Sequence, residues 1–193
     1  MDVADIKKLR EETGAGVLES KNALVECGGD FEKARTLLMK KGEAKAAKKG
    51  SREAKEGVVG SYIHSNGKVG ALVEINCETD FVARNDVLQQ FVKDICMQIV
   101  ALNPMALSSD DLPEDVVNQQ KEVILGETKG KPENIVEKIL AGKLDSFYKD
   151  NCLLSQPFIK DNDVTIQELL NNVTAKTGEK IVINKFSRFA IGG

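Results

Sequence analysis

The sequence has little of the material from which catalytic and metal sites are built. Its 193 residues include a single histidine, His64, which excludes a metal site with two histidine ligands. The four cysteines are far apart and form no Cys-x-x-Cys pair, so we expect neither a zinc site nor a disulfide framework. There is no glycine-rich phosphate loop and no nucleophile beside a base. We therefore predict a protein that is not an enzyme, with no catalytic residues, no metal and no cofactor.

Long hydrophobic runs and a strong positive charge are also missing. No apolar run approaches the length of about 20 residues that crosses a bilayer. The N-terminus, Met1–Asp5, has neither the basic start nor the apolar segment of a signal peptide. The formal net charge of −3 argues against nonspecific nucleic-acid binding as the main role. We expect a cytoplasmic protein that binds neither nucleic acid nor membrane.

The first 40 residues predict a bundle of three short helices. Apolar residues recur at helical spacing before the turn at 13–16, and a second helix spans 17–27. Gly28-Gly29 ends that second helix, and the carboxylate of Asp30 is suited to cap a third. Three helices of this size are similar to a ubiquitin-associated domain. Such a small bundle has a thin core and little stability of its own.

A basic segment at 41–56 separates this bundle from the rest of the chain. Between Lys40 and Lys55, seven basic residues meet two acidic ones, and hardly any apolar side chain is larger than alanine. Such a segment buries too little apolar surface to fold by packing, so we predict a linker. A nascent helix in its Ala-Lys portion and a nucleic-acid tether are the alternatives.

Strand patterns begin at Gly57, where a core domain is predicted over 57–193. Two alternating runs flank Ser65–Lys68, whose Asn-Gly pair is typical of a hairpin turn. In the C-terminal segment Ile181, Ile183 and Phe189 alternate, which predicts a third strand in an antiparallel three-stranded sheet.

Helices are predicted between the second and third strands. One carries an apolar stripe at Leu88, Phe91, Val92, Ile95, Ile99 and Leu102. Residues 112–141 predict an antiparallel helical hairpin, because Pro113 and Pro132 suit helix starts and 126–131 suits a turn. The apolar face of this hairpin is thin, which indicates a projecting arm. A last helix begins at Thr165 and stops at Thr177-Gly178. The predicted fold class is α+β.

Several separate blocks, in one order along the chain, resemble the bacterial elongation factor Ts family. They are Leu9-Arg10, Thr13–Gly16, Lys21–Leu24, Gly28–Asp30, Gly42–Lys49, Glu74–Asn85 and Gln156–Phe158. The resemblance implies a guanine-nucleotide exchange factor that binds the GDP-bound GTPase elongation factor Tu and promotes GDP release during translation elongation. Long members of the family have two strand-and-helix repeats in the core, whereas this chain has room for one. It resembles the short members, in which two copies pair, so a homodimer is expected.

The most specific block contains Thr79, Asp80, Phe81 and Val82, which we call the wedge. The resemblance implies that Phe81 inserts between side chains of the GTPase near its Mg²⁺ site and that Asp80 helps to fix the same region. A rigid aromatic side chain suits this task, because it offers a large contact area at a small entropy cost. The alternative is structural: Phe81 would be a hydrophobic staple on its own helix, and Asp80 a helix cap.

Further candidate partner contacts follow from the resemblance. They are Gly14, Ala15, Gly16, Val17 and Lys21 in the bundle, and His64, Arg84 and Asn85 in the core. The bundle residues would contact the nucleotide domain of the GTPase. Helix punctuation with a solvated lysine explains them almost as well, a surface role explains His64, and a surface ion pair explains Arg84. The alternative function is a ubiquitin-associated-type adaptor whose bundle binds a protein while the core dimerises.

Overall fold

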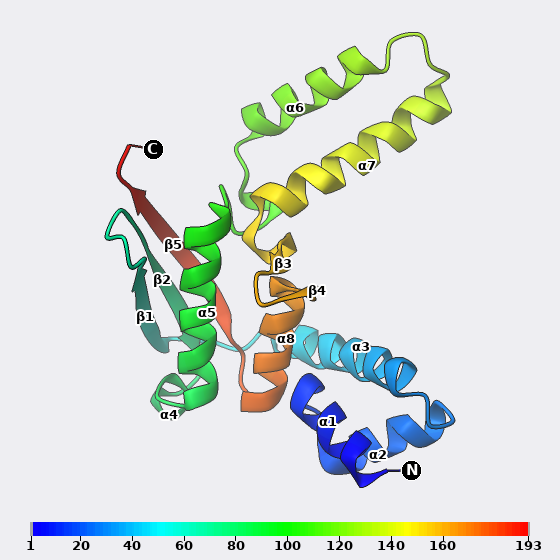
Figure 1. Cartoon of the computed structure of the whole chain (residues 1–193), viewed down its shortest axis with the longest axis vertical. Coiled ribbons are helices and arrows are strands. Elements are labelled where there is room, and N and C mark those ends of the chain that lie inside the picture. Colours follow the sequence, from blue (N-terminus) through cyan, green and yellow to red (C-terminus); the bar gives the residue numbers. More distant parts are fainter. Residues whose placement is uncertain (1, 193) are drawn as a thin grey trace. The chain divides into compact units, whose positions relative to one another are not determined.

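The computed structural model describes residues 2–192, except for the side chains of residues 43 and 45–48. Over this range the chain forms eight α-helices, an antiparallel three-stranded sheet and a small two-stranded sheet (Figure 1). The predicted combination of helices with an antiparallel three-stranded sheet is confirmed. The chain divides into two compact units, Met1–Met97 with Gln167–Gly193, and Gln98–Ile166. No helix of the described residues has the length and apolar character needed to cross a membrane.

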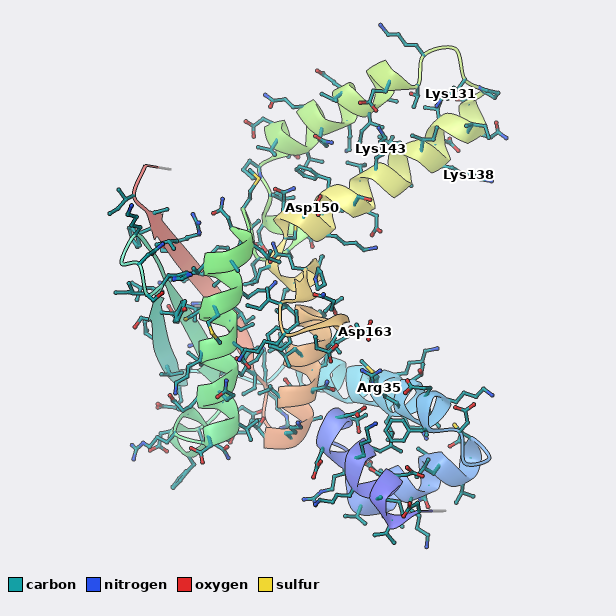
Figure 2. All side chains as sticks on the ribbon, viewed as in Figure 1. Arg35, Lys131, Lys138, Lys143, Asp150 and Asp163 are labelled. Carbon is teal, nitrogen blue, oxygen red and sulfur yellow. The ribbon has the colours of Figure 1, made fainter. Side chains whose placement is uncertain are left out.

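The first unit begins with the three predicted helices. They are α1 (Val3–Thr13), α2 (Val17–Glu26) and α3 (Phe31–Lys49). Their shared core consists of small and aliphatic side chains. The buried members are Leu9, Ala23, Leu24, Ala34 and Leu38. Arg35 of α3, labelled in Figure 2, pairs with Glu12 of α1 at 3.3 Å and connects the two helices outside this core.

Helix α3 is longer than the sequence predicts. Residues 41–49, the first part of the predicted linker, continue the helix, and only residues 50–55 form a turn and coil before β1 begins at Glu56. The reason is local, because alanine and lysine are among the residues with the highest intrinsic helix propensity. A helix of such residues can extend beyond the predicted bundle, as the alternative of a nascent helix supposes.

The main sheet consists of β1 (Glu56–Ile63), β2 (Val69–Cys77) and β5 (Val182–Ala190), with β2 in the centre (Figure 1). The predicted hairpin at Ser65–Lys68 is confirmed: the amide of His64 donates to the carbonyl of Val69 at 2.9 Å. On β2, alternate side chains are buried as predicted. They are Ala71, Val73, Ile75 and Cys77.

A register shift between β2 and β5 changes the sheet face on which the last side chains of β5 lie. Glu74 pairs with Lys185 while Ile75 pairs with Ile183, so β5 contains one extra residue at this point. Beyond such a bulge the alternation reverses. Ile183 is therefore buried, but Phe189 lies on the opposite face and is 67% exposed. The prediction that Phe189 alternates in phase with Ile181 and Ile183 is wrong for this reason.

The segment after β2 forms two helices. A short helix, α4 (Asp80–Ala83), precedes the long α5 (Asp86–Leu102), which covers one face of the sheet (Figure 1). The wedge therefore lies at a short helix that is separate from the long one. The predicted apolar stripe of α5 is buried from Leu88 to Ile99, but Leu102, in the last turn, is 42% exposed.

The second unit contains the helical arm, α6 (Glu114–Glu127) and α7 (Glu133–Asn151), after a 3₁₀ turn η1 (Ser109–Asp111). The antiparallel hairpin is as predicted, and Figure 2 shows Lys143 of α7 extending toward α6, where it pairs with Glu127. Helix α7 continues ten residues beyond the predicted end. Phe147 and Tyr148, near that end, pack on the cluster of buried Ala106, Leu112 and Cys152.

A second 3₁₀ turn and a small hairpin that the sequence did not predict complete this unit. They are η2 (Leu153–Ser155), β3 (Pro157–Phe158) and β4 (Asp161–Thr165). The buried Gln98 holds the start of this hairpin: its amide donates to the Gln156 side chain at 3.2 Å and to the Pro157 carbonyl at 3.0 Å. The chain then enters α8 (Ile166–Thr177), which ends before Gly178 as predicted.

Candidate functional site

The candidate site is the short helix α4, where an aromatic ring points into solvent. The Phe81 side chain is 83% exposed, whereas the next two residues, Val82 and Ala83, are 9% and 8% exposed. A hydrophobic staple would require Phe81 to pack against its own helix. Its exposure excludes that packing, so α4 is attached through Val82 and Ala83 and presents Phe81 outward.

The start of α4 is fixed by hydrogen bonds. Thr79 is the N-cap residue, and its hydroxyl oxygen accepts from the amide of Val82 at 3.4 Å. The same hydroxyl donates to the carboxylate of Glu179 at 2.7 Å. Oε2 of Glu179 also accepts from the amides of Glu78 at 3.1 Å and Thr79 at 3.0 Å. A helix of four residues has too few internal bonds to hold itself, so these external bonds are needed.

The other end of α4 is also held. The side-chain amide of Gln89 donates to the carbonyl of Ala83 at 2.6 Å. Asn85 has a structural position: its side-chain oxygen accepts from the amide of Val87 at 2.8 Å and thereby caps α5. Arg84 pairs with Asp80 at 3.0 Å; the Arg84 side chain is exposed and that of Asp80 is about half-buried. The cap of α4 is thus Thr79, and Asp80 is free of that task.

The carboxylate of Glu78 accepts bonds from two segments. The backbone amide of Lys180 donates to it at 2.6 Å, and the Arg52 guanidinium lies 3.3 Å away. The Lys180 amide, with a smaller contribution from Arg52, lowers the pKa of Glu78 below the usual value of 4.5 for a glutamate. Glu78 therefore stays ionised to a lower pH than a free glutamate, directly beside the wedge.

The predicted contact residues of the bundle surround the turn between α1 and α2. Gly14 adopts a left-handed conformation with φ of +69° and ends α1. The methylene stem of Lys176 packs against it, and Nζ of Lys176 donates to the carbonyl of Glu11 at 2.8 Å. Burial lowers the pKa of this lysine. The turn is thus shaped by the left-handed backbone of Gly14 and by its contact with Lys176 of α8.

The remaining predicted residues of the turn differ in exposure. Gly16 donates its amide to Glu19 at 3.2 Å, at the N-terminus of α2. Val17 is 59% exposed, and Lys21 is exposed on α2. Ala15 packs against the bundle core. Only Val17 and Lys21 of the group therefore offer side chains to a partner.

His64 lies at the opposite end of β2 from the wedge. It follows β1 at the hairpin turn, while α4 follows the other end of β2 after a strand of nine residues. Its Nδ1 is 3.1 Å from Oγ of Ser65 and its ring is exposed. Within one chain, the structure therefore does not bring His64 together with Phe81.

Comparisons with known proteins cover nearly the whole chain. The sequence profile of the family described as Elongation factor TS matches residues 6–193. The chain belongs to the elongation factor Ts family. It is 51% identical over 189 residues to Elongation factor Ts of Caldanaerobacter subterraneus subsp. tengcongensis, covering 97% of this chain and 94% of that protein. It is 52% identical over 191 residues to Elongation factor Ts of Geobacter metallireducens, covering 98% and 88%.

In this elongation factor Ts chain, sequence reasoning missed Glu179. The residue stands between the helix stop at Gly178 and the strand β5, where a glutamate gives no signal of its own. Its contact with Thr79 spans 100 residues of sequence. Only the three-dimensional arrangement reveals that Glu179 supports the elongation factor Ts segment that carries Phe81.

Proposed function

We propose that this chain is a guanine-nucleotide exchange factor that binds elongation factor Tu in its GDP form and promotes GDP release by disturbing the Mg²⁺ and phosphate contacts. Membership of the elongation factor Ts family implies nucleotide exchange on elongation factor Tu in translation elongation. The step itself involves no covalent chemistry. It requires only that contacts between the GTPase and the phosphates become weaker.

One observation supports the wedge: the Phe81 side chain is 83% exposed on a helix that is held by buried Val82 and Ala83 and by hydrogen bonds at both ends. A large aromatic side chain in solvent contributes little to the stability of its own chain. Interface hot spots are enriched in aromatic anchors that enter a pocket of the partner. In the proposed mechanism Phe81 enters the GTPase near its Mg²⁺ site, while Asp80 and Arg84 supply charged contacts beside it.

The energy required is within reach of such an anchor. Each tenfold loss of nucleotide affinity corresponds to about 1.4 kcal/mol of differential contact energy. A thousandfold loss therefore needs about 4 kcal/mol, the size of one buried aromatic anchor with a few polar contacts. Linkage makes the effect reciprocal, because GDP must weaken the binding of the factor by the same ratio.

In the same proposal, the N-terminal bundle is ubiquitin-associated-like and contacts the nucleotide domain of the GTPase. The exposed side chains of Val17 and Lys21 beside the turn Gly14–Gly16 support this role. The competing adaptor function also uses the bundle, but it gives Phe81 no task. Substitution of Phe81 would then leave binding of the partner unchanged.

We further propose that two copies pair through the outer face of the sheet. Apolar side chains are exposed on this face or beside it: Val59, Ile63, Leu72, Phe189 and Ile191. All of these except Val59 line a shallow cavity of about 650 Å³ formed by β1, β2 and the end of β5. Soluble monomers rarely expose a contiguous apolar patch of this kind. A second copy would cover it with an identical surface, which suits a two-fold interface.

The exchange function is tested with purified elongation factor Tu loaded with a fluorescent GDP. Addition of the chain should accelerate GDP release, and excess GDP should weaken capture of the chain by immobilised elongation factor Tu. Release at the spontaneous rate, or capture that does not depend on GDP, would contradict the proposal.

A further inference from the structure

Two glutamates form hydrogen bonds that connect the segment after β2 with the segment before β5. Glu179 accepts from the amides of Glu78 and Thr79 and from the Thr79 hydroxyl, at 3.1, 3.0 and 2.7 Å. In return, Glu78 accepts from the amide of Lys180 at 2.6 Å. We call these four residues, Glu78, Thr79, Glu179 and Lys180, the carboxylate clamp. The clamp is reciprocal, because each segment supplies both a carboxylate and backbone donors.

A third segment is attached to the same clamp. Nζ of Lys180 donates to the carbonyls of Gly50 at 2.7 Å and Arg52 at 2.9 Å. The guanidinium of Arg52 lies 3.3 Å from the carboxylate of Glu78. The coil that leads from α3 into β1 is therefore tied to the segment that precedes α4.

The position of the clamp determines the direction of α4. Thr79 is both a member of the clamp and the N-cap of α4, so Phe81 lies two residues beyond a fixed point. Glu179 satisfies two backbone amides that precede the first turn, together with the hydroxyl that caps it. Without this carboxylate, a four-residue helix loses the bonds that orient its start, since its own internal bonds are few.

We propose that Glu179 is a positioning residue for nucleotide exchange: it holds the start of α4 so that Phe81 is presented to the GTPase in one orientation. The inference rests on the proposed function above. A side chain that already has its bound orientation loses less entropy on binding. If only a fraction of molecules presents the ring correctly, the apparent affinity falls by that fraction. Glu179 touches no nucleotide in this account and acts through Phe81.

The test is a double-mutant cycle of Glu179→Ala and Phe81→Ala, measured as the second-order rate constant for GDP release from elongation factor Tu. We expect Glu179→Ala to lower the rate constant about tenfold, which corresponds to one tenth of the molecules presenting the ring. In the Phe81→Ala background, Glu179→Ala should have no further effect. A purely structural role for Glu179 would instead give the same tenfold loss in both backgrounds.

The matched control is Asp111→Ala. Asp111 also accepts from a backbone amide and a hydroxyl, both of Ser108, at 3.0 and 2.5 Å, but it belongs to the second unit. We expect it to leave the exchange rate unchanged. Hydrogen exchange should show faster amide exchange across Thr79–Asn85 in Glu179→Ala and the wild-type rate in Asp111→Ala. If Glu179→Ala proves too unstable to purify, Glu179→Gln, which keeps one acceptor oxygen, should give a smaller loss with the same dependence on Phe81.

The two proposals fail in different ways. Equal losses from Glu179→Ala with and without Phe81 would overturn the positioning role and leave the exchange function standing. A wild-type rate for Glu179→Ala, with a reduced rate for Phe81→Ala, would do the same. A wild-type rate for Phe81→Ala alone would overturn the wedge, and the positioning role with it.

Discussion

Gly60 of β1 lies directly against Val92 of α5. A Cβ atom built on Gly60 would collide with Cγ1 of Val92 and would lie 3.6 Å from Sγ of Cys96. The glycine therefore lets the helix approach the sheet at this point. The apolar stripe of α5 packs closely against the buried face of the sheet, so the contact between Gly60 and Val92 sets the distance between helix and sheet.

Substitution of Gly60 by alanine should destabilise the chain. Inserting a methyl group into a packed contact usually costs about 1–3 kcal/mol. The measurement is urea unfolding followed by circular dichroism. Gly126→Ala in α6 is the control, because a Cβ there meets no atom within 4 Å and alanine favours a helix. Equal stability of the Gly60→Ala variant and the wild type would show that the helix is not closely packed at this point.

A charged residue on the outer face of the sheet should separate the proposed homodimer. Phe189 is 67% exposed, so Phe189→Lys should leave the fold intact while placing a charge in the paired face. Light scattering at micromolar concentration should report a dimer for the wild type and a monomer for the variant. Val123→Lys, which changes an exposed residue of α6, should remain dimeric. A monomeric wild type would contradict the pairing.

Acidification should weaken the bonds of Glu78. Its folded-state pKa is lowered, first by the Lys180 amide and then by Arg52, so its ionised form is favoured in the folded state. The stabilisation is complete above the usual pKa of 4.5 and is lost as the pH falls through the lowered value. The difference in unfolding free energy between the wild type and Glu78→Gln should therefore shrink from pH 7 to pH 3. A difference independent of pH would contradict this assignment.

Cys96 should resist thiol reagents in the folded chain. The side chain is fully buried, and burial raises its pKa to about 11, so hardly any reactive thiolate forms at pH 8. Cys27, which is partly exposed, should react first. Mass spectrometry of peptides after brief alkylation distinguishes the two sites. Rapid alkylation of Cys96 without unfolding would show that α5 separates readily from the sheet.

The sequence predicts those elements whose pattern extends over many residues and depends only on neighbours in the chain. The stripe of α5, the alternation on β2 and the turn at Ser65–Lys68 follow from neighbouring residues, and all three are confirmed except for Leu102 at the end of the stripe. The phase of Phe189 could not be predicted, because one extra residue in β5 shifts it and period-two reasoning has no means to locate a bulge. The end of α3 was missed because the high helix propensity of alanine and lysine continues the helix to Lys49, beyond the three-helix bundle that the apolar pattern predicts.

The assignment of the candidate site stays a prediction, and only part of its structure could be anticipated from the sequence. The wedge residues follow from the resemblance, and the exposure of Phe81 is what that reading requires. Two structural tasks in the same block could not be read from the sequence: Thr79 caps α4, and Asn85 caps α5. Glu179 was missed because its partners are about 100 residues away. Contacts at such a distance depend on the sheet order, which the spacing of residues does not reveal.

The central claim is tested most directly by GDP release with Phe81→Ala, measured by stopped-flow fluorescence. Removing a hot-spot aromatic costs about 2 kcal/mol of binding free energy, which should slow GDP release about 30-fold. The melting temperature should hardly change, because an exposed side chain contributes little to stability. Val123→Ala, the matched control on α6, should release GDP at the wild-type rate. Wild-type release by Phe81→Ala, or a large fall in its melting temperature, would contradict the account.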